Sequence, residues 1–139
     1  MTRINVVPVE ILTDKHLLAE YKEITRPFNK AYKRLQDNNL NYNKPDNYVL
    51  GTGHESFFFD KLLYLHNRYD QLKVELCARK FNINLDLYHE ISDKFTLWFE
   101  DSILWNDYIP QPNDIYLNMT RLVRRSNIES VDIELASNN

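Results

Sequence analysis

Apolar residues recur at steps of three and four along four stretches of this chain, which is the spacing that places them on one face of an α-helix. The predicted helices cover residues 15–36, 55–80, 87–104 and 113–127. The chain has only two glycines, Gly51 and Gly53, so few residues interrupt these patterns. We therefore predict an all-α fold in which residues 1–139 form one compact helical domain.

The first predicted helix, residues 15–36, has one apolar and one basic face. The apolar face carries Leu17, Tyr21, Ile24, Phe28, Ala31, Tyr32 and Leu35. At 100° of rotation per residue, five basic residues lie within about 80° of one another on the opposite side of the helix: Lys15, Lys22, Arg26, Lys30 and Lys33. A face of one charge sign can bind phosphate groups, although a charged helix face is often simply solvated.

Proline and acidic residues mark the middle of this helix. Pro27 has no amide hydrogen to donate to the carbonyl of Glu23, so we expect a kink or a helix restart near Glu23. His16, Glu20 and Glu23 share one flank of the helix, which could suggest a metal site. No second set of ligands is evident elsewhere in the sequence, so we predict neither a metal nor a cofactor.

Composition limits the possible classes of protein. The formal net charge of the 139 residues is −3, so any surface that binds nucleic acid must be local. The single cysteine, Cys77, cannot form an intrachain disulfide, and we expect it to be a small buried residue. No apolar run approaches the roughly 18 residues of a membrane span, and no secretory leader is visible. We expect a soluble, cytoplasmic monomer with no membrane partner.

The last predicted helix adds a second group of basic residues. Arg121 and Arg125 lie four residues apart on one face, with Arg124 beside them. The segment 126–139 that follows contains three acidic residues and no lysine or arginine. We expect this segment to be a flexible acidic tail, which would repel DNA if it lay nearby.

The N-terminus offers a reactive group. A residue as small as Thr2 usually permits removal of Met1, which would leave the α-amine of Thr2 free beside Arg3. An α-amine has a pKa near 7.7–8.0, so part of it is neutral at physiological pH and can form a Schiff base with an electrophilic carbon. Taken alone, Thr2 is more simply a small residue tolerated after the initiator methionine.

Several segments, in order along the chain, resemble the pyrimidine-dimer DNA glycosylase and AP-lyase family, which includes the phage endonuclease V-like enzymes. They are Met1-Thr-Arg-Ile-Asn5, His16-Leu-Leu-Ala-Glu20-Tyr-Lys-Glu23 with Arg26, Leu50-Gly-Thr-Gly-His54 with Phe57-Phe58 and Asp60-Lys-Leu62, Phe81-Asn-Ile83, Tyr108-Ile-Pro110 and Thr120-Arg-Leu122. The resemblance implies an all-helical domain with its N-terminal segment threaded between helices. It also implies a bifunctional enzyme whose partner is double-stranded damaged DNA.

The resemblance assigns roles to individual residues. The Thr2 amine would attack the sugar carbon that bears the damaged base and hold the sugar as an imine, after which β-elimination would cleave the strand. Glu23 matches the essential carboxylate, expected to stabilise positive charge on the sugar and assist proton movement. DNA-binding roles are expected for Arg3, His16, Lys22, Arg26, Lys33, Arg121 and Arg125.

The sequence departs from the family pattern at several places. Lys22 stands where arginine is common, which keeps the charge and loses bidentate phosphate binding. Residues 85–106 form a longer, tryptophan-richer segment, and the aromatic, basic tail of the phage protein is missing. Two alternatives therefore stay open: a DNA-binding relative that has no activity or only AP-lyase activity, and a helical interaction module that binds no nucleic acid. The module leaves the basic face unexplained.

Overall fold

The computed structural model describes residues 2–126 of the chain. Its α-helices are α1 (Asp14–Glu23), α2 (Thr25–Gln36), α3 (Leu62–Ala78), α4 (Leu85–Phe99) and α5 (Pro112–Ser126). Two short 3-10 helices, η1 (Val9–Ile11) and η2 (Ser56–Phe58), lie in the connections, and no strand occurs within residues 2–126. The predicted all-α fold is confirmed. The expected acidic tail lies outside the described residues, apart from Ser126, which ends α5.

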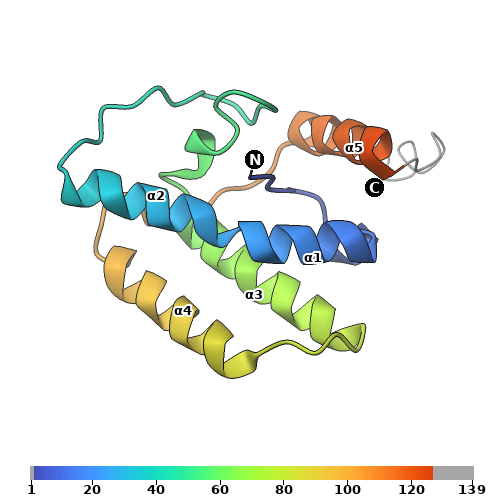
Figure 1. The fold of residues 1–139 in the computed structure, drawn as a ribbon. Helices are drawn as coiled ribbons and strands as arrows, with labels where there is room; N and C mark the ends of the chain where they lie inside the picture. The colour runs from blue at the N-terminus through green and yellow to red at the C-terminus, as the bar shows by residue number, and fades with distance from the viewer. Residues whose placement is uncertain (1, 127–139) are drawn as a thin grey trace.

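The predicted helix over residues 15–36 is in fact two helices. The hydroxyl oxygen of Thr13 accepts a hydrogen bond from the amide of His16 at 3.2 Å and caps the start of α1. Helix α1 ends at Glu23, and α2 restarts at Thr25, so the interruption expected from Pro27 is confirmed. The two helices lie nearly end to end in Figure 1.

Helices α2 and α4 are joined by stacked aromatic rings. The ring centroids of Phe28 and Phe95 lie 4.1 Å apart, and those of Tyr32 and Trp98 lie 3.7 Å apart. Such pairs contribute about 0.5–1.5 kcal/mol beyond the burial of their area. Trp98, one of the two tryptophans of residues 85–106, is therefore partly buried and packs against the core.

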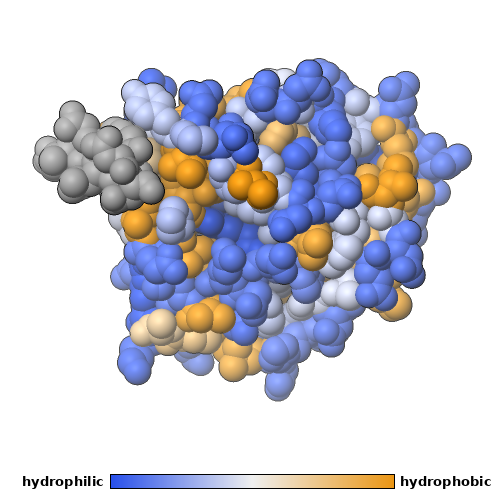
Figure 2. Space-filling model, turned by 180° about the vertical axis from the view of Figure 1, so that it is seen from behind, coloured by the Kyte–Doolittle hydropathy of each residue, from blue (hydrophilic) through white to orange (hydrophobic). Residues whose placement is uncertain are grey.

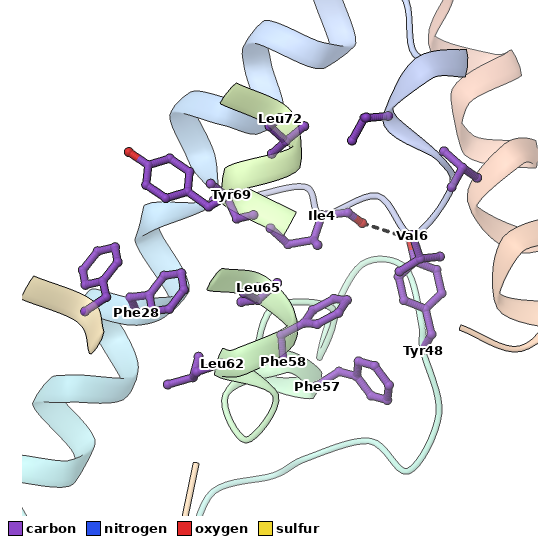
Figure 3. Close-up of a cluster of buried hydrophobic side chains, with 14 of the residues drawn as sticks. Ile4, Val6, Phe28, Tyr48, Phe57, Phe58, Leu62, Leu65, Tyr69 and Leu72 are labelled. Carbon is purple, nitrogen blue, oxygen red and sulfur yellow. Dashed lines mark hydrogen bonds between the residues drawn. The ribbon is translucent and has the colours of Figure 1, made fainter. Parts of the chain in front are cut away.

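The core of the molecule is built around α3, which packs against α1 and α4. Figure 3 shows side chains of this core, contributed by α2, α3, the loop before α3 and the N-terminal segment. Within the predicted helix 55–80, the apolar residues that recur at steps of three and four are all buried: Phe58, Leu62, Leu65, Tyr69, Leu72 and Leu76. The helix is shorter than the predicted range of residues 55–80, since α3 begins at Leu62 and Phe58 lies in η2, but the spacing identified the buried face of α3 from Leu62 onward.

Two expectations were wrong. The helix predicted over residues 87–104 ends at Phe99, and Ile103, which continues its apolar spacing, is 74% exposed. Cys77 is exposed because it follows the buried Leu76 by one residue, and one residue along a helix turns the side chain by about 100° toward solvent. Neither residue belongs to the core.

The N-terminal segment lies between α1 and α5 in Figure 1, as expected from the resemblance. Its backbone and side chains contact α1, α3 and α5 through the hydrogen bonds described below. Within residues 2–126, no helix combines the length and the apolar character needed to cross a membrane. Among the same residues, no three acidic, histidine or cysteine side chains gather where they could hold a metal ion.

Candidate functional site

Residues 2–7 form an extended segment that is almost entirely buried. Thr2 is 7% exposed, and Ile4 and Val7 are fully buried. An extended segment makes no backbone hydrogen bonds within itself, so its amides and carbonyls need partners from other elements. The surrounding helices and the loop before α3 supply these partners through polar side chains.

One side of the segment is bound by the loop before α3. The amide of Ile4 donates to His54 Nε2 at 2.8 Å, and the hydroxyl of Tyr48 donates to the Ile4 carbonyl at 3.1 Å, the bond drawn in Figure 3. His54 Nδ1 lies 2.8 Å from the carbonyl oxygen of Val49. An amide N–H cannot accept, so Nε2 carries no proton and Nδ1 donates.

Burial keeps this histidine neutral. His54 is 5% exposed, and burial lowers its pKa to about 4, although the hydrogen bond to Val49 acts in the opposite direction. Protonation of Nε2 would remove the acceptor for the Ile4 amide. His54 is therefore a structural support of the segment that carries Thr2, a role that the sequence did not assign to it.

The other side of the segment is bound by α5. Asn118 Oδ1 accepts from the amides of Val6, at 2.7 Å, and Val7, at 3.2 Å. Its Nδ2 donates to Asn5 Oδ1 at 2.8 Å, and the same Asn5 oxygen accepts from Arg121. Helix α5 therefore contacts the segment through side chains one turn apart, and one of them is a predicted DNA-binding residue.

A buried ion pair lies beneath the segment. Arg68 Nε donates to Glu20 Oε2 at 2.9 Å, and Arg68 Nη2 donates to Glu20 Oε1 at 3.1 Å. Asn5 Nδ2 also donates to Glu20 Oε1, at 2.8 Å, and Arg68 Nη1 donates to the Val7 carbonyl. Burial opposes the charge of Arg68, but Glu20 outweighs it and raises the pKa of the guanidinium. Glu20 thus supports the fold rather than a metal.

Glu23 contacts the backbone directly after Thr2. The amide of Arg3 donates to Glu23 Oε1 at 2.9 Å. The nitrogen of Thr2 is three covalent bonds from the Arg3 nitrogen, so the two nitrogens are at most about 4 Å apart. With Met1 attached, the Thr2 nitrogen is an amide and marks the place of the amine that Met1 removal would produce. The structure therefore brings the two predicted catalytic residues together.

Three hollows in the surface are lined by Thr2, Arg3 or both. One, of about 210 Å³, is lined by Arg3, His16, Glu23 and Arg121, among others. A second, of about 660 Å³, is lined by Thr2 together with Lys30, Lys33 and Arg34 of α2. A third, of about 210 Å³, joins Thr2 and Arg3 to Arg121 and Arg124. The N-terminal segment thus lies between basic residues of α2 and of α5.

Figure 2 shows the molecule from behind, with a hollow near the middle of this face that is bordered by both hydrophilic and hydrophobic residues. Within the described part of the chain, the buried Nε of Arg3 has no hydrogen-bond partner. An unsatisfied buried donor is unusual in a folded protein.

The predicted DNA-binding residues are not all equally placed. Lys22 and Arg26 are exposed, and Lys22 lines a different hollow, of about 510 Å³, between α1 and α4. Arg125 belongs to α5, but its side chain lies outside the described residues. Burial is the first cause that lowers the pKa of His16, followed by the charge of Arg121. His16 therefore favours its neutral form.

Comparison with known families agrees with this arrangement. Residues 1–89 match the model of the family described as pyrimidine dimer DNA glycosylase. The match covers more than half of the 139 residues and includes Thr2, Glu23 and His54, whereas Asn118 and Arg121 of α5 lie beyond it. The chain therefore belongs to the pyrimidine dimer DNA glycosylase family.

Proposed function

We propose that this protein excises cyclobutane pyrimidine dimers from double-stranded DNA and then cleaves the strand at the resulting AP site, using the α-amine of Thr2. The observation that carries the proposal is the hydrogen bond from the Arg3 amide to Glu23 Oε1, because it fixes a carboxylate beside the Thr2 nitrogen. A nucleophile and a charge-stabilising group within reach of one atom are the minimum that this chemistry requires.

In the proposed reaction, the neutral amine attacks C1′ of the damaged nucleotide, and the C1′–N bond breaks with its electrons leaving on the base. Loss of a proton from nitrogen and opening of the sugar ring give an imine. Removal of a C2′ proton then expels the 3′-phosphate by β-elimination, and water releases the enzyme. The Glu23 carboxylate would stabilise the positive charge that develops on the sugar and the imine.

Charges of both signs lie near Thr2 and act on its amine. Arg3, Arg121 and Arg124 share a hollow with Thr2, and nearby cations disfavour the protonated form and lower the pKa of an amine. Glu23 acts in the opposite direction. The same cations, with Lys30 and others on α2, would bind the phosphates on the two sides of the lesion.

The test is reductive trapping. Protein shown by mass spectrometry to lack Met1 is incubated with duplex DNA containing a dimer or an AP site, in the presence of borohydride, and the adduct is mapped. An adduct at Thr2 on both substrates supports the proposal. An adduct on AP-site DNA alone would leave a lyase without dimer excision, and no adduct on either would leave a DNA-binding protein without this activity.

Glu23→Gln separates the charge of this residue from its position. Glutamine keeps an Oε1 that can accept from the Arg3 amide, so the segment should stay in place while the negative charge is lost. We expect dimer excision to fall by about 100-fold or more with DNA affinity nearly unchanged. Glu100→Gln, at the exposed end of α4, is the matched control and should leave both quantities unchanged.

A further inference from the structure

Asn118 makes more contacts with the N-terminal segment than any function assigned so far explains. It is fully buried in α5, and its amide group uses both ends: Oδ1 accepts from Val6 and Val7, and Nδ2 donates to Asn5. A buried amide that is hydrogen-bonded through both its oxygen and its nitrogen holds its partners in one arrangement. Asn118 lies beyond residues 1–89 and outside every motif identified in the sequence.

The same contacts link the segment to the DNA-binding side of α5. Asn5 Oδ1 accepts from both Asn118 and Arg121, which lie three residues apart on α5. Arg121 also lines the hollows that contain Arg3 and Thr2. The position of Arg121 relative to Thr2 is therefore set through Asn5 and Asn118.

The contacts that the N-terminal segment makes with the loop before α3 and with α1 do not connect it to α5. His54 and Tyr48 contact the backbone of Ile4, and Glu23 contacts the amide of Arg3, but none of these contacts involves α5. Without Asn118, the hydrogen bond from Arg121 to Asn5 would remain, but the amides of Val6 and Val7 would no longer be bound to α5, and α5 could shift relative to the segment while the segment stayed bound to the loop and to α1. DNA whose phosphates are bound by α5 would then be displaced, and its sugar would no longer lie where the Thr2 amine can attack it.

We propose that Asn118 is a positioning residue that aligns the phosphate-binding side of α5 with the Thr2 amine. The inference rests on the proposed function, since it concerns the step in which that amine attacks the sugar. Misplacement of a reacting group by about 1 Å can cost about 100-fold in rate. Loss of alignment should therefore slow imine formation on bound DNA far more than it weakens binding.

The decisive variant is Asn118→Leu, which is similar in volume and removes both hydrogen-bonding functions. Imine formation is measured by borohydride trapping in single turnovers at saturating AP-site DNA, and affinity is measured separately by fluorescence anisotropy. We expect the trapping rate to fall by about tenfold or more, with the dissociation constant within about threefold of wild type. Asn113→Leu, an exposed position of the same helix, should change neither.

Asn118→Asp is the conservative variant. It keeps an oxygen that can accept from the amides of Val6 and Val7 but loses the donor to Asn5 Oδ1, so it should regain only part of the trapping rate lost in Asn118→Leu. Circular dichroism and thermal melting establish that each variant is folded. A trapping rate for folded Asn118→Leu within twofold of wild type, or an equal loss in Asn118→Asp, would overturn the proposal.

Amide hydrogen exchange tests Asn118 without using activity. In Asn118→Leu, or in Asn118→Ala if the leucine variant does not fold, the amides of Val6 and Val7 are compared with wild type, because both substitutions remove their acceptor. Faster exchange at these two amides in the variant supports the contact, and unchanged exchange overturns it. If wild-type protein without Met1 forms no adduct, the proposed function fails, and exchange alone then decides whether Asn118 holds the segment.

Discussion

The buried neutral state of His54 makes the stability of this protein depend on pH. In the folded protein Nε2 must accept from the Ile4 amide, and burial lowers the pKa of His54 to about 4 from its ordinary value of 6.5. Below pH 6.5 the unfolded chain binds a proton that the folded chain does not. Stability is therefore fully present above pH 6.5 and decreases as the pH falls from 6.5 toward 4.

The size of this loss follows from the difference between the two pKa values. A difference of roughly 2.5 units corresponds to about 3 kcal/mol when the whole interval is crossed. Between pH 7.5 and pH 5, the part contributed by His54 is about 2 kcal/mol, because the folded state is still mostly unprotonated at pH 5. Below pH 4 the contribution of His54 stops changing.

Urea unfolding of wild type and His54→Gln at pH 7.5 and pH 5 measures this contribution. The glutamine variant cannot titrate at this position, so the loss of unfolding free energy between the two pH values should be smaller than in wild type by about 2 kcal/mol. His89→Gln, which replaces an exposed histidine on α4, should follow wild type. If wild type and His54→Gln differ by less than about 0.5 kcal/mol, His54 does not cause the pH dependence.

Two further predictions concern charge. Arg68→Met leaves Glu20 buried without its charged partner and should lower the free energy of unfolding, measured in urea, by about 3–5 kcal/mol. Adding Glu20→Gln should recover part of this loss, and no recovery would argue against the ion pair as its cause. Arg26→Glu should weaken binding to dimer-containing DNA and lower the slope of log affinity against log salt by about one. Lys94→Glu on α4 is its control. If Arg26→Glu binds this DNA as tightly as wild type at both of two salt concentrations, Arg26 has no role in binding.

The sequence predicted those parts of the fold that depend on periodicity. The spacing of Leu62, Leu65 and Leu72 identified the buried face of α3, and Pro27 predicted the interruption between α1 and α2. Helix ends were less predictable. Ile103 continued the apolar spacing of α4, but the helix ends before it, since local pattern alone does not mark where tertiary contacts end.

The sequence identified the reactive residues of the candidate site but not their supports. Thr2 and Glu23 were recognised through the resemblance, and the hydrogen bond from Arg3 to Glu23 places them together. Arg68 and Asn118 carried no signal, because each acts on a segment that is 61 to 112 residues away in sequence. A polar residue within a helix can face solvent or the core, and only the tertiary fold decides between them.

The N-terminal segment needs several buried hydrogen bonds because Thr2 must be held at one place along the axis of the segment. Apolar burial of Ile4 and Val7 favours contact with the core, but the hydrophobic effect has no direction and does not fix the segment along its own axis. A slip by one residue would remove the Asn5 amide from Glu20 and would move the Ile4 amide away from His54. Each buried polar group left unsatisfied costs about 1–3 kcal/mol. Two such losses disfavour the slipped arrangement by about 30-fold or more, so these buried polar contacts determine where the Thr2 nitrogen lies.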